Sequence, residues 1–471
     1  MNRSDAPNPA GRRAFLRQAA AFGSLLGPAA GPLALSLGAA ATAASAQTVN
    51  DYKALVCVFL WGGADNANIL VPHTLADYNR YAAARTNLAL PRNELLSFVP
   101  ANQGGRSLGL HNSLSAVKSL YDRRRLAFIA NIGPLNQPTT LAEYAAGSVP
   151  LPPKLFSHND QQSMWQAFAP EGAPYGWGGR IGDLLASNNG LAGVTAITLD
   201  GYAAFLNGLQ TLGARVNAWG PLDVSPWLPN PDSWNGLFDS PVATEAWRKL
   251  VMERETNASL IEREYGNVRR RGVQLNDEIG RALAAVPGLG GLFPDSRLGS
   301  QLQMVARLLL ARNSLRAKRQ VFFVGIGGWD HHSGLLNGGT GHLGLMQSVA
   351  ASLSAFDAWL SSAGLANNVT TFTASEFGRT LDSNGDGSDH GWGSHAMVMG
   401  GAVRGGNVYG TMPVVDLDTS TDVGRGSLLP TTSVDQLVST LALWFGVPDA
   451  SLALVAPNIS RFTPRNLGFM A

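Results

Sequence analysis

Cysteine is nearly absent from this chain of 471 residues, which has Cys57 alone. A single cysteine excludes an internal disulfide framework and any zinc site built on several thiolates. Charged residues are also scarce, at 14% of the chain, against about 25% in an average soluble protein. Because 45% of the residues are hydrophobic, the composition excludes an intrinsically disordered chain. The length is sufficient for several domains or for one large α/β unit.

The small positive charge of the chain is concentrated at its N-terminus. Residues 1–46 contain four arginines and one aspartate, a sum of +3, whereas the whole chain carries +2, so the remainder carries about −1. No strongly basic surface is therefore predicted. Neither a nucleic acid nor an anionic membrane surface is expected as a partner.

The N-terminal segment is typical of a twin-arginine export signal. Arg12-Arg13 precede an uncharged stretch rich in Ala, Gly and Leu that ends in a small-x-small pattern, with cleavage predicted between Ala46 and Gln47. The alternative is an N-terminal membrane anchor, but glycines and prolines interrupt the stretch and weaken a spanning helix. No later segment has about 18 uninterrupted apolar residues. We therefore expect export through the twin-arginine translocase, a periplasmic or secreted location, and no stable membrane insertion after cleavage.

Apolar runs alternate with amphipathic stretches along the mature chain. Short continuous apolar runs predict strands that are covered on both faces, and they lie at 55–60, 126–130, 194–199, 321–326 and 369–373. Helical spacing predicts helices at 114–124, 299–319, 342–363 and 435–445. This order of elements predicts an α/β fold, with a doubly wound, mostly parallel sheet and helices on both of its faces.

One domain is expected from residue 47 to residue 471, with residues 202–298 as a mainly helical insertion or cap. The stretch 219–239 is rich in Pro, Trp and Asn, which is a loop composition, and 241–285 has helical spacing and many charges. Two interpretations of this insertion remain open. It is either a pair of peripheral helices or a lid over a substrate site.

Three predicted strands run into a carboxylate: Asp65 after the first, Asp330 after the fourth and Glu376 after the fifth. In an open α/β sheet, ligands bind outside the carboxyl ends of the parallel strands. Glycines precede Asp65 and Asp330, and glycine lets the backbone and a ligand approach closely. The sequence therefore places acidic side chains where a ligand is expected.

Half of the eight histidines lie in two short segments near these strand ends, namely His331, His332, His390 and His395. Each segment also contains an aspartate, Asp330 or Asp389. Oxygen and nitrogen ligands of this kind predict one or two divalent cations, with Zn, Mn, Fe, Mg and Ca as candidates. Adjacent residues of an extended chain point to opposite faces, so one of the two neighbouring histidines is expected to be a ligand.

Ser157 and Arg379 are the candidate catalytic residues. Ser157 precedes a predicted helix, where it is either an N-cap or a nucleophile or oxyanion ligand at the positive helix end. Arg379 would bind an anionic oxygen through two hydrogen bonds, or would pair with a nearby carboxylate. Residues 382–387 match the first half of a calcium loop, but Gly393 stands where such a loop has a glutamate.

Several of these motifs, in this order along the chain, resemble the domain-of-unknown-function family 1501. They are the segments 58–65, 156–161, 176–180, 327–332, 375–380 and 389–393. Members of that family are typically exported bacterial proteins with twin-arginine signals. The family is similar to the alkaline phosphatase and sulfatase superfamily, whose members hydrolyse phosphate or sulfate esters with one or two metals at the strand ends.

The resemblance implies a set of metal ligands: Asp65, Asp330, His331 or His332, Glu376, and His390 or His395. It also implies that Ser157 stands in the place of the nucleophile. Phe377 replaces a histidine of the superfamily pattern, which removes one ligand. The sulfatase segment Cys-x-Pro-x-Arg is absent, and this excludes a formylglycine sulfatase.

The sequence thus predicts an exported metal-dependent hydrolase that acts on a small phosphate or related anionic ester. The alternative is a non-catalytic periplasmic protein that retains the fold and binds or assembles a partner. The Trp- and Pro-rich stretch 219–239 would present the interface of such a protein.

Overall fold

The computed structural model describes residues 49, 51–221, 240–252 and 259–471. The predicted export signal, residues 1–46, and most of the stretch 219–239 lie outside the described residues. Within the described part of the chain, no helix has the length and apolar character needed to cross a membrane.

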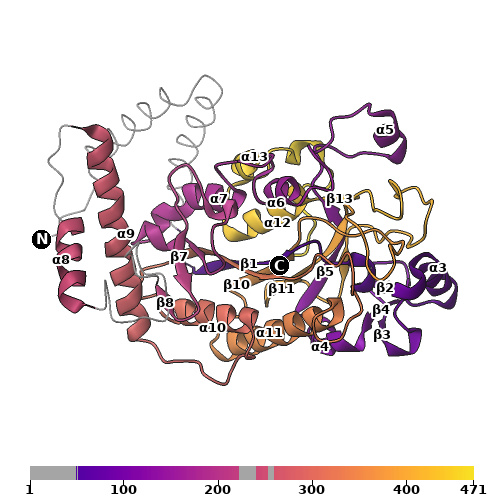
Figure 1. Cartoon of the computed structure of the whole chain (residues 1–471), viewed down its shortest axis with the longest axis horizontal. Helices are drawn as coiled ribbons and strands as arrows, with labels where there is room; N and C mark the ends of the chain where they lie inside the picture. Colours follow the sequence, from indigo (N-terminus) through magenta and orange to yellow (C-terminus); the bar gives the residue numbers. More distant parts are fainter. Residues whose placement is uncertain (1–48, 50, 222–239, 253–258) are drawn as a thin grey trace, which may run out of the picture.

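A large mixed sheet runs through the middle of the molecule (Figure 1). Among the described residues it has ten strands, in the order β12-β5-β11-β10-β1-β9-β6-β7-β8, with β13 also paired to β5. The five strands β10, β1, β9, β6 and β7 run parallel to one another, whereas β11 runs antiparallel to both β10 and β5, and β8 runs antiparallel to β7. The bounds are β1 Lys53–Trp61, β5 Leu126–Gly133, β6 Ala196–Thr198, β7 Ala214–Asn217, β8 Gly220–Pro221, β9 Arg319–Gly327, β10 Val369–Ala374, β11 Ser394–Met399, β12 Val408–Tyr409 and β13 Thr432–Ser433.

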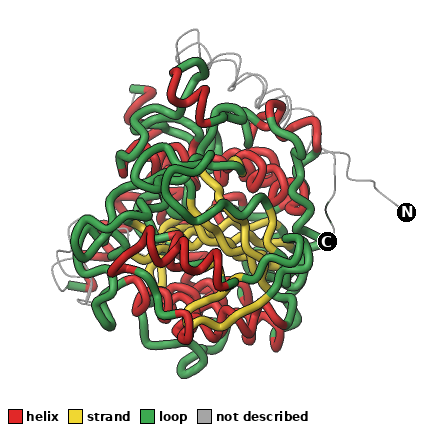
Figure 2. Tube along the Cα trace, turned by 90° about the vertical axis from the view of Figure 1, so that its right-hand side faces the viewer, coloured by secondary structure: helices red, strands yellow, loops and turns green. Residues whose placement is uncertain are grey.

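Helices cover both faces of this sheet, so that the strands lie between two helical layers (Figure 2). The helices are α3 Leu75–Arg85, α4 Ser115–Asp122, α5 Leu141–Ala146, α6 His158–Ala167, α7 Trp177–Leu185, α8 Pro241–Met252, α9 Leu260–Ala284, α10 Arg297–Leu310, α11 His342–Ser362, α12 Val434–Phe445 and α13 Leu452–Val455. A small second sheet, in the order β2-β4-β3, lies beside the main one and consists of β2 Val71–Pro72, β3 Leu95–Phe98 and β4 Leu108–His111.

Strand β1 shows why the central strands have continuous apolar runs. Its even-numbered residues, such as Val56 and Val58, pack in the core that contains α4, α10 and α11. Its odd-numbered residues, such as Leu55 and Phe59, pack in the opposite core that contains α7 and α12. Because successive side chains of a strand point to opposite faces, a strand with a core on each side needs apolar residues at every position. The predicted α/β class, with a mostly parallel sheet flanked by helices, is confirmed.

One predicted helix was too long. Helical spacing suggested 299–319, but α10 ends at Leu310, and Arg319 is the first residue of β9. The buried side chain of Arg319 donates to the carbonyl oxygens of Phe445 and Asp51, so a charged residue is accommodated inside a strand. Between 202 and 298, the described residues form α8 and α9 beside one end of the sheet (Figure 1), but also β7, which pairs with β6.

The order of the strands brings the predicted site segments together. Because β10, β1 and β9 are parallel neighbours, the loops that follow them leave the same edge of the sheet. Strand β11 is antiparallel to β10, so the segment that precedes Ser394 reaches that edge as well. Residues from three distant parts of the sequence, namely the loop after β1, the loop after β9 and the connection between β10 and β11, therefore meet at the carboxyl edge of the parallel strands.

Two buried histidines predict a loss of stability in acid. Burial lowers the pKa of His342 to about 4 and that of His395 to about 3. Because both values lie below the pKa of an unfolded histidine, the folded chain binds fewer protons, and stability that is present above pH 6.5 is lost as the pH falls. Each of the two histidines should lower the free energy of unfolding by about 2 kcal/mol as the pH falls from 7 to 5. Urea unfolding of the wild type and of His342→Leu across this range checks the expectation, since the variant should show a smaller loss; equal losses would contradict it.

Candidate metal centre

Three chain segments supply the polar groups at the carboxyl edge of the sheet: the loop after β9, the connection between β10 and β11, and the start of α6. The loop after β9 contains Asp330 and His332, and the loop before β11 contains Asp389 and His390. Helix α6 begins with His158, and Glu376 follows β10. These residues lie up to 232 positions apart in the sequence, from His158 to His390, and they are joined by hydrogen bonds and ion pairs.

The turn after β1 packs tightly beneath this group. Gly62 and Gly63 have φ angles of 124° and 82°, which other residues rarely adopt. A Cβ atom on Gly62 would lie 2.5 Å from the backbone nitrogen of Asp330, and one on Gly63 would overlap the ring of Phe377. That ring is buried and lies against the rings of His158 and His390, at centroid distances of 4.9 and 4.6 Å. The glycines after β1 thus serve the packing of the site.

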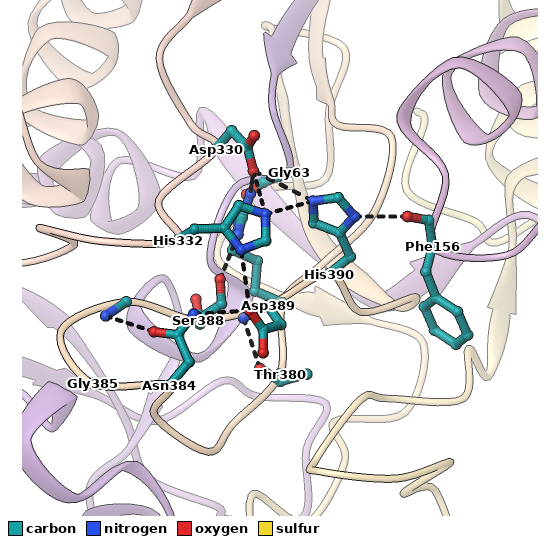
Figure 3. A network of polar contacts seen from close by, with 12 residues as sticks. Gly63, Phe156, Asp330, His332, Thr380, Asn384, Gly385, Ser388, Asp389 and His390 are labelled. Carbon is teal, nitrogen blue, oxygen red and sulfur yellow. Dashed lines mark hydrogen bonds and ion pairs between the residues drawn. The ribbon is translucent and has the colours of Figure 1, made fainter.

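Three imidazoles converge on the carboxylate of Asp330 (Figure 3 shows two of them). Its oxygens lie 3.5 Å from Nε2 of His158, 3.2 Å from Nε2 of His332 and 3.4 Å from Nε2 of His390. The Nε2 atoms of His332 and His390 are 2.9 Å apart. Within the described residues, His158, Asp330 and His390 form the one group whose ligand atoms lie close enough together to hold a metal ion. His332 adjoins this group through its contacts with Asp330 and His390.

The other nitrogen of each imidazole has an acceptor. Nδ1 of His158 lies 2.9 Å from Oε1 of Glu376, and Nδ1 of His332 lies 3.0 Å from Oδ1 of Asp389. Nδ1 of His390 lies 2.7 Å from the carbonyl oxygen of Phe156. Because ionised carboxylates and carbonyls only accept, each Nδ1 is assigned the proton, and a neutral ring then presents a lone pair at Nε2. Partners of this kind orient the histidine ligands of metals in proteins.

These lone pairs lack a counterpart. Nε2 of His158 is buried and has no hydrogen-bond partner. Two neutral Nε2 atoms facing each other at 2.9 Å, as in His332 and His390, repel unless a proton or a cation lies with them. The donor set of three imidazoles and one carboxylate fits a divalent cation that prefers nitrogen and oxygen ligands.

Electrostatics favour an ionised carboxylate in this group. Burial alone would raise the pKa of Asp330, but the hydrogen bond and charge of Arg379 lower it below its usual value. The hydrogen bond to Glu376 raises the pKa of His158, whereas burial lowers the pKa of His390. Burial also opposes ionisation of Asp389, yet hydrogen bonds from Asn384, Arg425 and His332 outweigh it and lower the pKa of Asp389 to about 2.

Glu376 and Asp389 orient imidazoles. The buried Glu376 also accepts hydrogen bonds from the backbone nitrogen of Gly62, at 2.8 Å, and from Nε2 of Gln162, at 3.0 Å. All three donors share Oε1, so this carboxylate holds the start of α6 against the turn after β1. The sequence predicts both acids as metal ligands, whereas the structure places each of them behind a histidine.

The hydrogen-bond donors of Arg379 are directed at groups of the protein itself. Its buried guanidinium donates to the carbonyl oxygens of Gly62, Gly63 and Ser388 and to the carboxylate of Asp330. Of the two alternatives for Arg379, an anionic ligand or a nearby carboxylate, the structure shows the pairing with a carboxylate.

Three other predicted ligands lie outside the group of potential ligands. Asp65 forms a buried ion pair with Arg85 at 2.8 Å and accepts a hydrogen bond from Ser388. Nδ1 of the buried His395 accepts from the backbone nitrogen of Asn131. His331 contacts the carbonyl oxygen of Thr340, so His332, and not its neighbour, faces Asp330.

The remaining candidates also have partners. Ser157 occupies the N-cap position of α6 but makes no capping bond with its side chain, and its hydroxyl donates to Asp160 at 2.9 Å. In the suspected calcium loop, Asp382 pairs with Arg425, and the amide nitrogen of Asn384 donates to Asp389. An amide that presents its nitrogen to an acid is not arranged as an oxygen ligand of Ca²⁺.

The sequence patterns do not identify His158 as a potential ligand, although they identify its neighbour Ser157 as a candidate catalytic residue. A local signal was present, because His158 and Gln162 are four residues apart and so share one face of a helix. Both contact Glu376. The role of Phe156 had no such signal: its φ of 71°, unusual for a bulky residue, aims its carbonyl oxygen at His390.

Comparison with known proteins gives one family match over part of the chain and no activity. The model of a family described as a protein of unknown function, DUF1501, matches residues 237–455. This match, over somewhat less than half of the chain, supports the expected likeness to DUF1501. The DUF1501 match includes Asp330, His332 and His390. It begins at residue 237, so His158 lies before it. No curated protein matches the chain.

The packing beneath the site predicts that Gly63→Ala destabilises the fold strongly. Alanine would have to adopt the positive φ of this position, and its methyl group would overlap the buried ring of Phe377. The free energy of unfolding should therefore fall by about 2 to 4 kcal/mol. The matched control is Gly147→Ala, which has a φ of 59° but nothing within 4 Å of the new atom, and should cost about 1 kcal/mol. Urea unfolding of both variants measures the difference, and equal losses would show that the overlap has no effect.

Proposed function

We propose that this protein is an exported metal-dependent hydrolase of a phosphate or related ester, with one divalent cation held by His158, His332, His390 and Asp330. The arrangement of the three imidazoles carries the proposal. Each has an acceptor at Nδ1 and directs Nε2 to the same carboxylate. A set of three nitrogens and one oxygen suits Zn, Mn or Fe better than Mg or Ca, which prefer oxygen alone.

The site is open on one side, as a hydrolase requires. The side chains of Asp330 and His332 are each 47% exposed, while those of His158 and His390 are 27% and 23% exposed. A small ester can therefore approach from the side of Asp330 and His332. When bound, a divalent cation would act as a Lewis acid toward an ester oxygen and would favour deprotonation of a water or hydroxyl.

Two of the chain's own groups have parts in this proposal. Arg379 holds Asp330 ionised and in place, so that the Asp330 oxygen farther from the guanidinium stays available. Ser157 precedes His158 and donates its hydroxyl hydrogen to Asp160, so a nucleophile at this position would have a carboxylate that accepts its proton. Water is the alternative nucleophile.

We propose one cation, although the family resemblance allows two. The carboxylate that would serve a second metal, Asp65, is neutralised by the buried guanidinium of Arg85. Its two oxygens accept from Arg85, Ser388 and the backbone nitrogen of Asn68. The parallel strand ends and the position of the site support the likeness to the alkaline phosphatase and sulfatase superfamily, and with it a substrate of the phosphate-ester class.

Metal analysis of the purified protein tests the centre. We expect about one equivalent of Zn, Mn or Fe per chain, and a lower melting temperature after treatment with a chelator. His390→Ala and Asp330→Asn should lose most of the metal. His73→Ala, a histidine outside the group, should keep it. Less than about half an equivalent, with no change in melting temperature in the chelator, would contradict the metal centre.

Hydrolysis assays test the activity. The metal-loaded protein should cleave at least one member of a panel of phosphate monoesters, phosphate diesters and sulfate esters. His332→Ala should lower kcat/KM by about 100-fold or more, because an oriented ligand of the cation is removed. A protein that binds metal but cleaves none of these esters would favour the alternative, a non-catalytic periplasmic binding or assembly protein.

A further inference from the structure

A compact loop between β12 and β13 reaches the rim of the site. The buried carboxylate of Asp422 organises it by accepting hydrogen bonds from three backbone nitrogens, those of Asp418 at 2.9 Å, Gly424 at 2.7 Å and Gly426 at 2.8 Å. A carboxylate that receives three backbone donors keeps a loop in one conformation. The residues between Asp418 and Gly426 are therefore held in place by the loop itself.

Arg425 lies within this loop in a strained conformation. Gly424, Arg425 and Gly426 all have positive φ angles, of 127°, 58° and 73°. Such values suit glycine, but they are costly for an arginine. An added Cβ on Gly426 would lie 2.3 Å from that of Leu381, so the loop packs closely on the chain that carries Asp382. Strain of this kind indicates that the direction of the Arg425 side chain has a use.

The guanidinium of Arg425 connects two acids. Its Nε donates to Asp382 at 2.9 Å, and its Nη1 donates to Oδ2 of Asp389 at 2.5 Å. The other oxygen of Asp389, Oδ1, faces Nδ1 of His332 at 3.0 Å and accepts from Asn384 at 2.8 Å. Asp389 thus has one oxygen for Arg425 and one for the imidazole.

His332 needs this support more than the other imidazoles do. Glu376, which orients His158, is fully buried, and the carbonyl that orients His390 belongs to the backbone. His332 and its partner Asp389 are instead 47% and 31% exposed, so water competes for their hydrogen bond. A side chain on this rim keeps one orientation only if its partner is itself held.

We propose that Arg425 is a positioning residue for the metal centre: it holds Asp389, which in turn holds His332 with Nε2 toward Asp330. This inference rests on the proposed metal centre. It assigns a role to a residue that lies outside the group of ligands and 93 positions from His332 along the chain. An alternative use of Arg425, direct contact with an anionic substrate, makes a different prediction.

The variant Arg425→Gly separates the effect of the lost guanidinium from the effect of the strained backbone. Glycine accepts the positive φ without strain, so the unfolding temperature of the metal-free variant should equal or exceed that of the wild type. The affinity for Zn²⁺, measured by competition with a chromophoric chelator, should fall by about 10- to 100-fold, as for other groups that orient ligands. The Zn²⁺ affinity of Arg425→Lys should lie between those of the wild type and of Arg425→Gly. Arg465→Ala removes an exposed arginine that pairs with Asp449 and should leave the affinity unchanged.

A double-mutant cycle with Asp389→Asn tests whether Arg425 acts through Asp389. If Arg425 acts through Asp389, the two losses of Zn²⁺ affinity will not add, and the double variant will resemble Asp389→Asn alone. Additive losses would overturn the inference, and so would a Zn²⁺ affinity that Arg425→Gly leaves unchanged, including the case in which only KM rises. Absence of Zn²⁺ binding by the wild type would instead overturn the proposed metal centre and this inference with it.

Discussion

The guanidinium of Arg379 joins three chain segments at the carboxyl edge of the sheet. Arg379 itself follows β10, and its donors reach two carbonyls after β1, one carbonyl before β11 and the carboxylate after β9. A buried guanidinium has several donors in a rigid plane, and each must find an acceptor, so it specifies how the segments around it approach one another. The positions of Asp330 and of the turn at Gly62 both depend on this one side chain.

Charge pairing extends from this point across the whole site. Each of three aspartates has an arginine: Asp330 has Arg379, Asp65 has Arg85, and Asp389 has Arg425. A buried charge without a partner is costly, and these pairs give partners to the buried guanidiniums of Arg85 and Arg379. Among the described residues, the buried Nε2 of His158, which faces Asp330, has no hydrogen-bond partner. A divalent cation held there, as we propose, would bind this nitrogen.

The candidate centre combines two halves of the chain. The family match begins at residue 237 and includes the loops that carry Asp330, His332 and His390. His158 and the carbonyl of Phe156 come from before it, on a helix start that Glu376 and Gln162 hold against the turn after β1. The part of the chain before residue 237 therefore contributes both a potential ligand and the orientation of another.

Local patterns were sufficient for the main elements and for part of the site. Continuous apolar runs identified β1, β9 and β10, because a strand between two cores has no polar face. Asp330 and His390 followed from their places beside strand ends. The pattern failed at the end of α10, where helical spacing continued into the chain before β9, since the interior of the protein accepts the buried Arg319 through distant carbonyls.

The sequence by itself determined which chemical groups reach the edge of the sheet, because the end of a buried strand is a local property. Tertiary structure decided which of them face one another. Glu376 and His158 lie 218 residues apart, and the contact between them turns an expected metal ligand into the partner of an imidazole. Likewise, His332 and not His331 faces Asp330, since backbone direction after a glycine turn depends on packing against other segments. Hydrogen bonds across such distances form only when the whole sheet has assembled, and no short pattern specifies them.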